Sequence, residues 1–310
     1  EFQHRLVHDS HNPSILQQAA RGLKTDMDKF ISHLVSPPGF ETKMNSITVI
    51  SNHDEVGNAD RTVNVAMNHQ QGIPDGWARN AARMTFGVGM LSPGVPIFFQ
   101  GEESLAVNKF KWGIPSTWDV GWDWLDVGKD WDLGKVNIND DKVRLFRRLI
   151  DMPKNGRENS NEYKSLSDTD KKVFDYIASV PSEKREDAIM NIFRKLHFNY
   201  CKDVIALRRS SPAFDGDAEV KGIYTHNDNS VMAFTRKKNG EEFVVVGSLN
   251  KENLGNYNLP FPDGRWRLVC NSDASFYGGE NFGSKIEVNG GPGTVIDIPR
   301  GGMLVYKRVG

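Results

Sequence analysis

The residues best suited to chemistry gather in one four-residue run, Asn52-His53-Asp54-Glu55. This run directly follows Ser46–Ser51, a short β-branched and mostly apolar segment that predicts a strand covered on both faces. In parallel α/β folds, catalytic groups lie on the loops at the carboxyl ends of the strands. An adjacent histidine and aspartate in that place can bind sugar hydroxyls and set a carboxylate beside a developing cation. The simpler alternative is an Asx turn at the start of a loop, with a capping aspartate.

The elements expected to position this run alternate between helix and strand. Apolar residues at steps of three and four from Leu16 to Leu34 predict one amphipathic helix, which a Pro-Pro-Gly run ends. A polar loop is expected over residues 52–68, followed by a second helix at about Gly76–Leu91 and a buried strand at Val95–Phe99. This order is typical of a parallel sheet or an α/β barrel.

The rest of the chain changes in character twice. Five of the seven tryptophans lie in a loop over residues 108–135, and charge-rich helices are predicted after it at Asp141–Asp151, Asp168–Val180 and Glu186–Arg208. From Glu219 onward, short apolar runs separated by Gly, Asn, Asp and Pro turns predict an antiparallel β-sandwich. We therefore predict two domains, residues 1–210 and residues 211–310.

The composition is that of an ordinary globular protein, with 38% hydrophobic and 25% charged residues. A net charge of −1 argues against a binder of nucleic acid or of an anionic membrane, and no apolar run approaches the ~18 residues of a membrane span. Two cysteines, Cys201 and Cys270, fit a reducing compartment, so we expect a cytoplasmic location. The sequence starts at Glu1 without a Met or a signal-like segment, and we expect it to be part of a larger gene product.

Two stretches in this order resemble the alpha-amylase superfamily of glycoside hydrolases and transglycosylases. TVISNHDEVGN resembles the family's seventh barrel strand with its NHD signature, and ARNAARMTFGVGMLSPGVPIFFQGEE resembles the seventh helix and the eighth strand. Near the end of the chain, Asn271–Gly283 resembles the corresponding segment of 1,4-alpha-glucan branching enzymes. The run SNHDEV is more similar to branching enzymes, or to maltooligosyl trehalose trehalohydrolases, than to ordinary amylases. The resemblance implies the last strands and helices of a TIM-type (β/α)8 barrel, followed by an all-β C-terminal sandwich.

For chemistry, the resemblance implies a retaining reaction at an alpha-glucosidic bond, through a covalent glycosyl-enzyme. Asp54 matches the family's third carboxylate, which stabilises the oxocarbenium-like transition state, and it is the expected catalytic residue. His53 matches the neighbouring histidine that binds sugar hydroxyls. The residues expected to bind substrate are Asn52, His53, Glu55, Glu103 and Trp112.

The family's nucleophile and general acid do not appear in the sequence. The nucleophile normally lies in a Gly-x-Arg-x-Asp segment and the acid is a Glu on the next strand, but the nearest imitation, Gly22–Asp26, has Lys24 in place of the Arg. A barrel of about 250 residues needs roughly 180 residues before its seventh strand, whereas 45 precede Ser46. We expect about the last quarter of a barrel, inactive alone and partnered by the N-terminal part of the same enzyme. Such an open piece should expose apolar strand faces and unpaired edges.

Several other candidates have a competing structural explanation. Glu102 and Glu103 follow the second strand and could act with Asp54 as acid and base, although a structural or outer-subsite role is preferred. Exposed tryptophans of the 108–135 loop could stack on glucose rings, but packing explains most tryptophans equally well. The tryptophans considered for sugar contact are Trp112, Trp118 and Trp122.

The remaining polar clusters predict neither a metal nor a cofactor. His4, His8 and His11 have spacings that could ligate a metal on a helix, but they lack a Cys or Glu partner in register, so a solvated or substrate-facing segment is preferred. Four arginines are interpreted as surface or helix-end charges: Arg79, Arg83, Arg208 and Arg209.

We therefore expect part of a 1,4-alpha-glucan branching enzyme, an activity that cleaves alpha-1,4 linkages and forms alpha-1,6 linkages in glycogen or starch. One alternative is a hydrolase of the amylase or maltooligosyl trehalose trehalohydrolase type, which shares the covalent intermediate. A second alternative is a non-catalytic alpha-glucan-binding subunit. The expected ligand is an alpha-1,4-glucan, such as glycogen, starch or a maltooligosaccharide, and neither nucleic acid nor a membrane.

Overall fold

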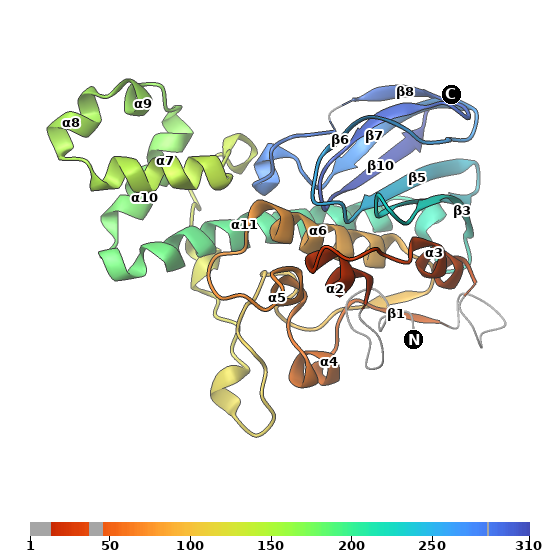
Figure 1. The fold of residues 1–310 in the computed structure, drawn as a ribbon, viewed down its shortest axis with the longest axis horizontal. Helices are drawn as coiled ribbons and strands as arrows, with labels where there is room; N and C mark the ends of the chain where they lie inside the picture. The colour runs from red at the N-terminus through yellow and green to blue at the C-terminus, as the bar shows by residue number, and fades with distance from the viewer. Residues whose placement is uncertain (1–13, 37–45, 284) are drawn as a thin grey trace.

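The structure is a computed structural model that describes residues 14–36, 46–283 and 285–310. Two long helices, α6 (Gly76–Leu91) and α11 (Arg185–Arg209), pack against each other in the middle of the molecule. They lie between a short pair of strands on one side and a large C-terminal sheet on the other (Figure 1). Within the described ranges, no helix is both long enough and apolar enough to cross a membrane.

The first described segment contains two short helices, so the prediction of one helix is wrong. Helix α2 (Ile15–Ala20) begins with a Ser14 capping box, and α3 (Met27–Val35) begins at the Asp26 cap. Gly22 turns the chain between them with a left-handed φ of 69°. The linker is then held by the C-terminal domain, because Thr25 Oγ1 donates to Ser230 Oγ at 3.0 Å. A tertiary contact thus overrides the helical periodicity.

The two predicted strands form a parallel pair. Strand β1 (Ile47–Val49) pairs with β2 (Val95–Ile97), and α6 connects them at the predicted bounds, which makes one β–α–β unit. The predicted polar loop of residues 52–68 instead contains two helices, α4 (His53–Asn58) and α5 (Thr62–Ala66). These helices have six and five residues, too few for a hydrophobic period to show in the sequence.

The strand pair is open to solvent on one face. The side chains of Ile47, Val95 and Ile97 are 54%, 56% and 42% exposed. The prediction that these strands are covered on both faces is therefore wrong for this chain, whereas the exposure expected of an open piece of a barrel is present. The covered face packs on α6, where Ile50 fits against Gly89 so closely that a Cβ atom there would lie 2.4 Å from its side chain.

A helical extension projects from the body of the molecule before α11 (Figure 1). It has its own hydrophobic core, in which Phe146 and Phe174 pack edge to face at 5.6 Å and Leu196 of α11 closes the cluster. The three predicted charge-rich helices are confirmed within one or two residues. The α-helices of the extension are α7 (Asp140–Asp151), α8 (Lys154–Asn159), α9 (Asn161–Lys164) and α10 (Asp168–Ser179). Single 3-10 turns lie at Pro115–Thr117, Asp123–Asp126, Leu133–Lys135 and Ser182–Lys184.

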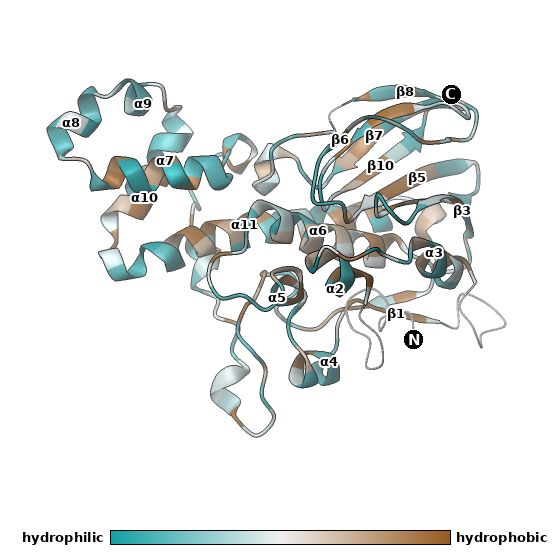
Figure 2. Ribbon diagram, in the orientation of Figure 1, coloured by the Kyte–Doolittle hydropathy of each residue, from teal (hydrophilic) through white to brown (hydrophobic). Residues whose placement is uncertain are grey.

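The C-terminal part is an antiparallel sandwich, as predicted. Its main sheet has six strands in the order β3-β4-β5-β10-β7-β8, and β6 and β9 form a second layer. One face of the main sheet packs on the two long helices and the other on the small layer, so the middle of β5, residues 243–246, is apolar on both faces (Figure 2). The strands are β3 (Glu219–His226), β4 (Val231–Lys238), β5 (Glu241–Ser248), β6 (Leu254–Asn258), β7 (Gly264–Asn271), β8 (Glu287–Gly290), β9 (Val295–Ile298) and β10 (Met303–Arg308), with 3-10 turns at Pro212–Phe214 and Ser275–Tyr277.

Buried arginines join α6 to the sandwich. The Arg83 guanidinium donates to the carbonyls of Ser272 and Tyr277 at 2.7 and 2.9 Å, and to Oδ1 of Asn80 at 2.7 Å. The amide of Asn80 donates in turn to Asp273 at 2.7 Å. Burial lowers the pKa of Arg83 to about 10. The segment that resembles branching enzymes, residues 271–283, is therefore one of the parts of the sandwich that hold α6.

The interpretation of the arginines as surface charges is wrong for Arg79 and Arg83, which are each 1% exposed. Arg79 pairs with Asp140 at 2.8 Å, which ties α6 to the helical extension. Arg208 does lie at the end of α11, but it donates to the carbonyls of Ser92 and Gly94 at 3.0 and 2.8 Å, just after the end of α6. The burial of these arginine side chains depends on how the helices pack, which cannot be predicted from a local sequence pattern.

Candidate active site

The candidate site lies where the two parallel strands end. Residue Ile50 after β1 donates its amide to the Ile97 carbonyl at 2.7 Å, and Phe99 after β2 donates its amide to Ser51 Oγ at 3.2 Å. Because β1 and β2 run in the same direction, the two loops that follow them leave from the same edge. The predicted site residues on these loops are therefore neighbours.

The run of residues 52–55 forms the start of α4. Asn52 is the helix cap, and its Oδ1 accepts the Glu55 amide at 2.9 Å. His53 and Asp54 follow in the first turn with side chains that are 54% and 64% exposed, and His53 Nε2 lies 3.6 Å from Asp54 Oδ1. The capping alternative thus holds for Asn52, a position expected to bind substrate. His53 and Asp54 remain accessible to a ligand.

An aromatic cluster brings Trp112 to His53. The two rings meet edge to face with centroids 5.4 Å apart, and Trp112 is 54% exposed. Phe110 supports Trp112 at 5.2 Å and packs on Phe99 at 5.3 Å, which follows β2. Aromatic pairs prefer this edge-to-face geometry. Trp112 is considered for sugar contact because an exposed indole can stack on a glucose ring, and the structure shows the packing that holds it beside His53.

A glycine in α4 permits this approach. A Cβ atom on Gly57 would lie 2.8 Å from Nε1 of Trp112 and 3.3 Å from Phe110. Any larger residue at this position would push the indole away from the helix that carries His53. Gly57 is a positioning residue that the sequence pattern did not reveal.

The two glutamates after β2 serve the loop itself. Glu102 is 8% exposed, and burial raises its pKa, although the nearby Arg61 guanidinium opposes that shift. Glu103 is half-buried, and its Oε2 accepts the Gly101 amide at 2.9 Å. The structural role preferred for this pair fits these contacts. Glu103 faces its own backbone, so its expected contact with substrate stays a prediction.

A buried polar network, absent from the sequence predictions, fixes the loops that carry the site. Arg61 is 1% exposed and donates through Nε to the Asn108 carbonyl at 3.0 Å and through Nη1 to the Gln100 carbonyl. Asp60, also 1% exposed, accepts from Asn64 at 2.6 Å and is paired with His69 at 2.9 Å. Buried charges need such partners. In the sequence, Asp60 and Arg61 are adjacent charged residues in a polar stretch. Nothing in that pattern distinguishes them from charged residues at the surface.

The other candidates lie elsewhere or outside the described residues. Trp118 stacks on Phe110 at 5.9 Å and so belongs to the aromatic cluster, whereas Trp122 packs on the buried Trp124 at 5.8 Å. Lys24 is paired with Asp228 at 2.8 Å, at the linker to α3. His4, His8 and His11 lie outside the described residues, among which no group of three or more His, Cys, Asp or Glu could hold a metal ion.

This arrangement suits recognition of a sugar. An imidazole and a carboxylate side by side supply hydrogen-bond donors and acceptors, and a half-exposed indole beside them supplies a flat apolar surface. All three groups are carried by α4 and by the loop after β2, and buried contacts behind them fix both. The geometry is therefore that of a prearranged binding surface with one carboxylate available to stabilise positive charge.

Comparison with known proteins places these residues in context. Residues 224–309 match the family described as "Alpha amylase, C-terminal all-beta domain". The chain is 37% identical over 90 residues to the 1,4-alpha-glucan branching enzyme GlgB of Mesorhizobium japonicum, a match that covers 27% of this chain and 12% of that enzyme. It is 31% identical over 121 residues to GlgB 1 of Rhizobium etli, covering 37% of this chain and 15% of the relative.

Solved structures extend the likeness to the whole chain at the level of the fold. Pullulanase type I from Bacillus subtilis, complexed with maltose, superposes with a TM-score of 0.55 at 12% identity, covering all of this chain and 35% of that one. The alpha-amylase of Geobacillus thermoleovorans, complexed with acarbose, gives a TM-score of 0.50 at 13% identity, covering 96% and 46%. The fold thus combines the last elements of an alpha-amylase-type barrel with the family's all-β domain. The C-terminal part of the chain matches the alpha-amylase all-β domain, and stretches of 90 and 121 residues are similar to 1,4-alpha-glucan branching enzymes.

Proposed function

We propose that this chain belongs to a 1,4-alpha-glucan branching enzyme, in which it supplies the third carboxylate and part of the substrate surface. The observation that carries the proposal is the exposed His53–Asp54 pair, held beside Trp112 at the carboxyl edge of the β1–β2 pair. Similarity to GlgB enzymes at 31–37% identity favours branching over hydrolysis as the outcome.

In this proposal, Asp54 faces the anomeric carbon of the bound glucosyl unit. Its negative charge stabilises the oxocarbenium-like transition state, and His53 donates a hydrogen bond to a ring hydroxyl that strengthens as charge develops. Trp112 supports the apolar face of a sugar ring. The residues that attack and protonate the bond are supplied by the N-terminal part of the enzyme, so these 310 residues alone do not turn over glucan.

The open face of the strand pair supports that division of labour. Ile47, Val95 and Ile97 expose 42–56% of their side chains, and apolar strand surface of this kind is normally covered. We propose that residues 1–210 complete a barrel with preceding strands and that residues 211–310 are the C-terminal domain. Alone, the chain should aggregate or be partly unfolded, which light scattering of the isolated chain would show.

The test uses the protein as isolated from its own organism, with any polypeptide that copurifies. Amylose is the substrate, and new alpha-1,6 linkages are counted by debranching while released reducing ends are counted in parallel. Asp54→Asn should lower kcat by at least about 10²-fold, since it removes charge stabilisation in the transition state. The exposed Asp130→Asn, which lies outside the proposed substrate surface, is the matched control and should act like wild type.

Each result separates one alternative from the others. Reducing ends without new branches would identify a hydrolase, and binding of amylose without turnover by the complete assembly would identify a glucan-binding subunit. Equal kcat values for wild type and Asp54→Asn would refute the role given to this carboxylate.

A further inference from the structure

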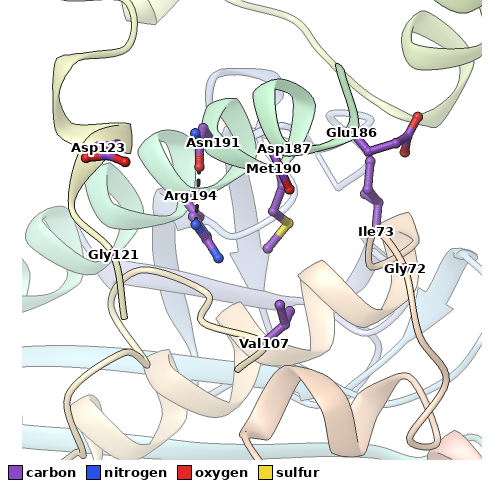
Figure 3. Close-up of a pocket in the computed structure, with 10 residues that line it drawn as sticks. All are labelled: Gly72, Ile73, Val107, Gly121, Asp123, Glu186, Asp187, Met190, Asn191 and Arg194. Atoms are coloured by element: carbon purple, nitrogen blue, oxygen red, sulfur yellow. Dashed lines mark hydrogen bonds between the residues drawn. The ribbon is translucent and has the colours of Figure 1, made fainter. Parts of the chain in front are cut away.

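A cavity lies between helix α11, the segment before α6 and the loop after β2. Its volume is about 460 Å³, which lies within the usual range for small-molecule sites. The first turns of α11 form one wall, Gly72 and Ile73 line it before α6, and Val107, Gly121 and Asp123 line it after β2 (Figure 3). No residue of the His53–Trp112 cluster lines it, so it is separate from the proposed catalytic surface.

The central polar group in this cavity is an incompletely paired arginine. The side chain of Arg194 extends from α11 into the hollow, and Nη1 donates to Asn191 Oδ1 at 3.2 Å (Figure 3). Its Nε is buried and has no hydrogen-bond partner among the described residues. Burial lowers the pKa of Arg194, and the charge of Asp187 opposes that shift. A half-buried guanidinium whose Nε has no acceptor in the described part of the chain can donate to a ligand that enters the cavity.

The charges around Arg194 favour a neutral ligand. Asp123 and Asp187 also line the cavity, so an anion would meet two carboxylates for one guanidinium. Glu186 is different, because Arg147 already pairs with it at 2.6 Å. Donors and acceptors side by side match a polyhydroxylated molecule, in which each hydroxyl both donates and accepts.

The floor of the cavity is apolar. Val107 lies below the guanidinium, Met190 lies beside it and Ile73 lies on the far side of the cavity from it, so aliphatic groups line the cavity along with the polar ones (Figure 3). A sugar ring has the same mixed character, with hydroxyls around its edge and C–H bonds on its face. A free phosphate or a metal ion would leave the aliphatic floor unused.

We propose that this cavity is an accessory binding site for a glucosyl unit of the glucan chain, with Arg194, Asn191 and Asp187 as its polar contacts. The proposal rests on the proposed function for the identity of the sugar. The loops of both sites leave the same edge of the β1–β2 pair, so one long glucan can engage both. The cavity would then select for chain length, not for the bond that is cleaved.

The test compares maltoheptaose binding by wild type, Arg194→Met and Trp112→Ala in the protein as isolated from its organism, by calorimetry and by hydrogen exchange. Arg194→Met should weaken binding about tenfold and abolish the ligand-induced protection of residues 185–194. Protection around residues 110–118 should persist in this variant. Arg144→Met is the matched control, because this arginine is 67% exposed on α7. Asn191→Leu replaces Arg194→Met if the latter has a lower melting temperature.

Two outcomes would overturn the accessory site. The first is an unchanged Kd with unchanged protection in Arg194→Met, and the second is Arg194-dependent binding of inorganic phosphate in place of maltoheptaose. In either case, a loss of binding in Trp112→Ala would leave the proposed function standing. If Trp112→Ala binds maltoheptaose with the wild-type Kd while Arg194→Met weakens binding as expected, the result would count against the proposed function and not against the accessory site.

Discussion

The two β regions of this chain use similar residues and reach opposite degrees of burial. Val95 in the parallel pair is 56% exposed, whereas Val245 in the main C-terminal sheet is fully buried. The C-terminal sheet has a layer on each face within the same chain, with α6 and α11 on one side and β6–β9 on the other. Within residues 14–36, 46–283 and 285–310, the parallel pair has a layer on one face only. An apolar, β-branched sequence therefore predicts that a strand is buried in the complete protein. It does not predict whether the residues that bury it belong to this chain.

The comparison depends on α6, which serves both regions. One face of the helix packs on β1 and the other on β5 and β10. Hydrophobic residues from the first and the last parts of the chain, such as Leu16 and Val305, accordingly belong to one continuous core. The β1–β2 pair, which is open on one face, is thereby packed through α6 against the C-terminal sandwich.

The largest loss of stability is expected from removing the hydrogen bonds of Arg83 that join α6 to the sandwich. Arg83→Met leaves the carbonyls of Ser272 and Tyr277 and Oδ1 of Asn80 without this donor, which should cost about 3–5 kcal/mol of unfolding free energy. Urea unfolding should then show two transitions, the first for the β1–β2 side. Arg209→Met on the exposed end of α11 is the control. A single transition at the wild-type midpoint would contradict this account of α6.

A smaller effect should appear as acid sensitivity at the same junction. His197 of α11 is 1% exposed, its Nε2 bonds the Glu102 carbonyl at 2.9 Å, and burial lowers its pKa to about 3. The unfolded chain takes up this proton near pH 6.5 while the folded one stays neutral, so stability falls as the pH falls below 6.5. Between pH 7 and pH 5 the loss should be about 2 kcal/mol.

His197→Gln isolates this contribution, because it keeps a donor for the carbonyl and removes the titration. Its unfolding free energy should change less between pH 7 and pH 5 than that of wild type, as measured by urea melts at each pH. The exposed His53→Gln should keep the full wild-type slope. Identical slopes in all three proteins would show that His197 is not the group responsible.

The smallest effect comes from one substitution made in both β regions. Val245→Thr buries a hydroxyl in a complete core and should cost about 1–2 kcal/mol, whereas Val95→Thr on the open face should cost less than about 0.5 kcal/mol. Chemical unfolding of the two variants, at a concentration where light scattering detects no aggregation, gives both values. If a further polypeptide covers β2 in the assembled protein, the cost of Val95→Thr should rise toward that of Val245→Thr when it is present. Equal costs in the isolated chain would mean that the open face is closed in solution.

Regular elements with strong local signals were predictable from the sequence. The bounds of α6 followed from its apolar face and from the Pro93-Gly94 break, and the antiparallel domain followed from its turn spacing. The break between α2 and α3 was missed, because it depends on Thr25 reaching a turn of the C-terminal domain more than 200 residues away. Local periodicity cannot report such a contact.

Some residues of the candidate site could likewise be predicted from the sequence, and others could not. His53 and Asp54 could be named from their position after a strand and from the NHD resemblance, and both are accessible in the structure. The residues behind them could not, because Arg61, Asp60 and Gly57 act through burial and close approach. A charged side chain or a glycine in a polar stretch has the same appearance in a sequence whether it is packed or solvated.

The contact made by Arg83 has a consequence for how related sequences vary. Two of its three acceptors are main-chain carbonyls, which every amino acid carries, so residues 272 and 277 can change identity without losing the bond. The neighbouring Asn80–Asp273 bond, in contrast, joins a side chain of α6 to a side chain of this loop. We therefore expect that correlated substitutions among homologues would reveal the Asn80–Asp273 bond but not the Arg83 bonds. The arginine constrains the backbone path of the opposing loop, and not the amino acids in it.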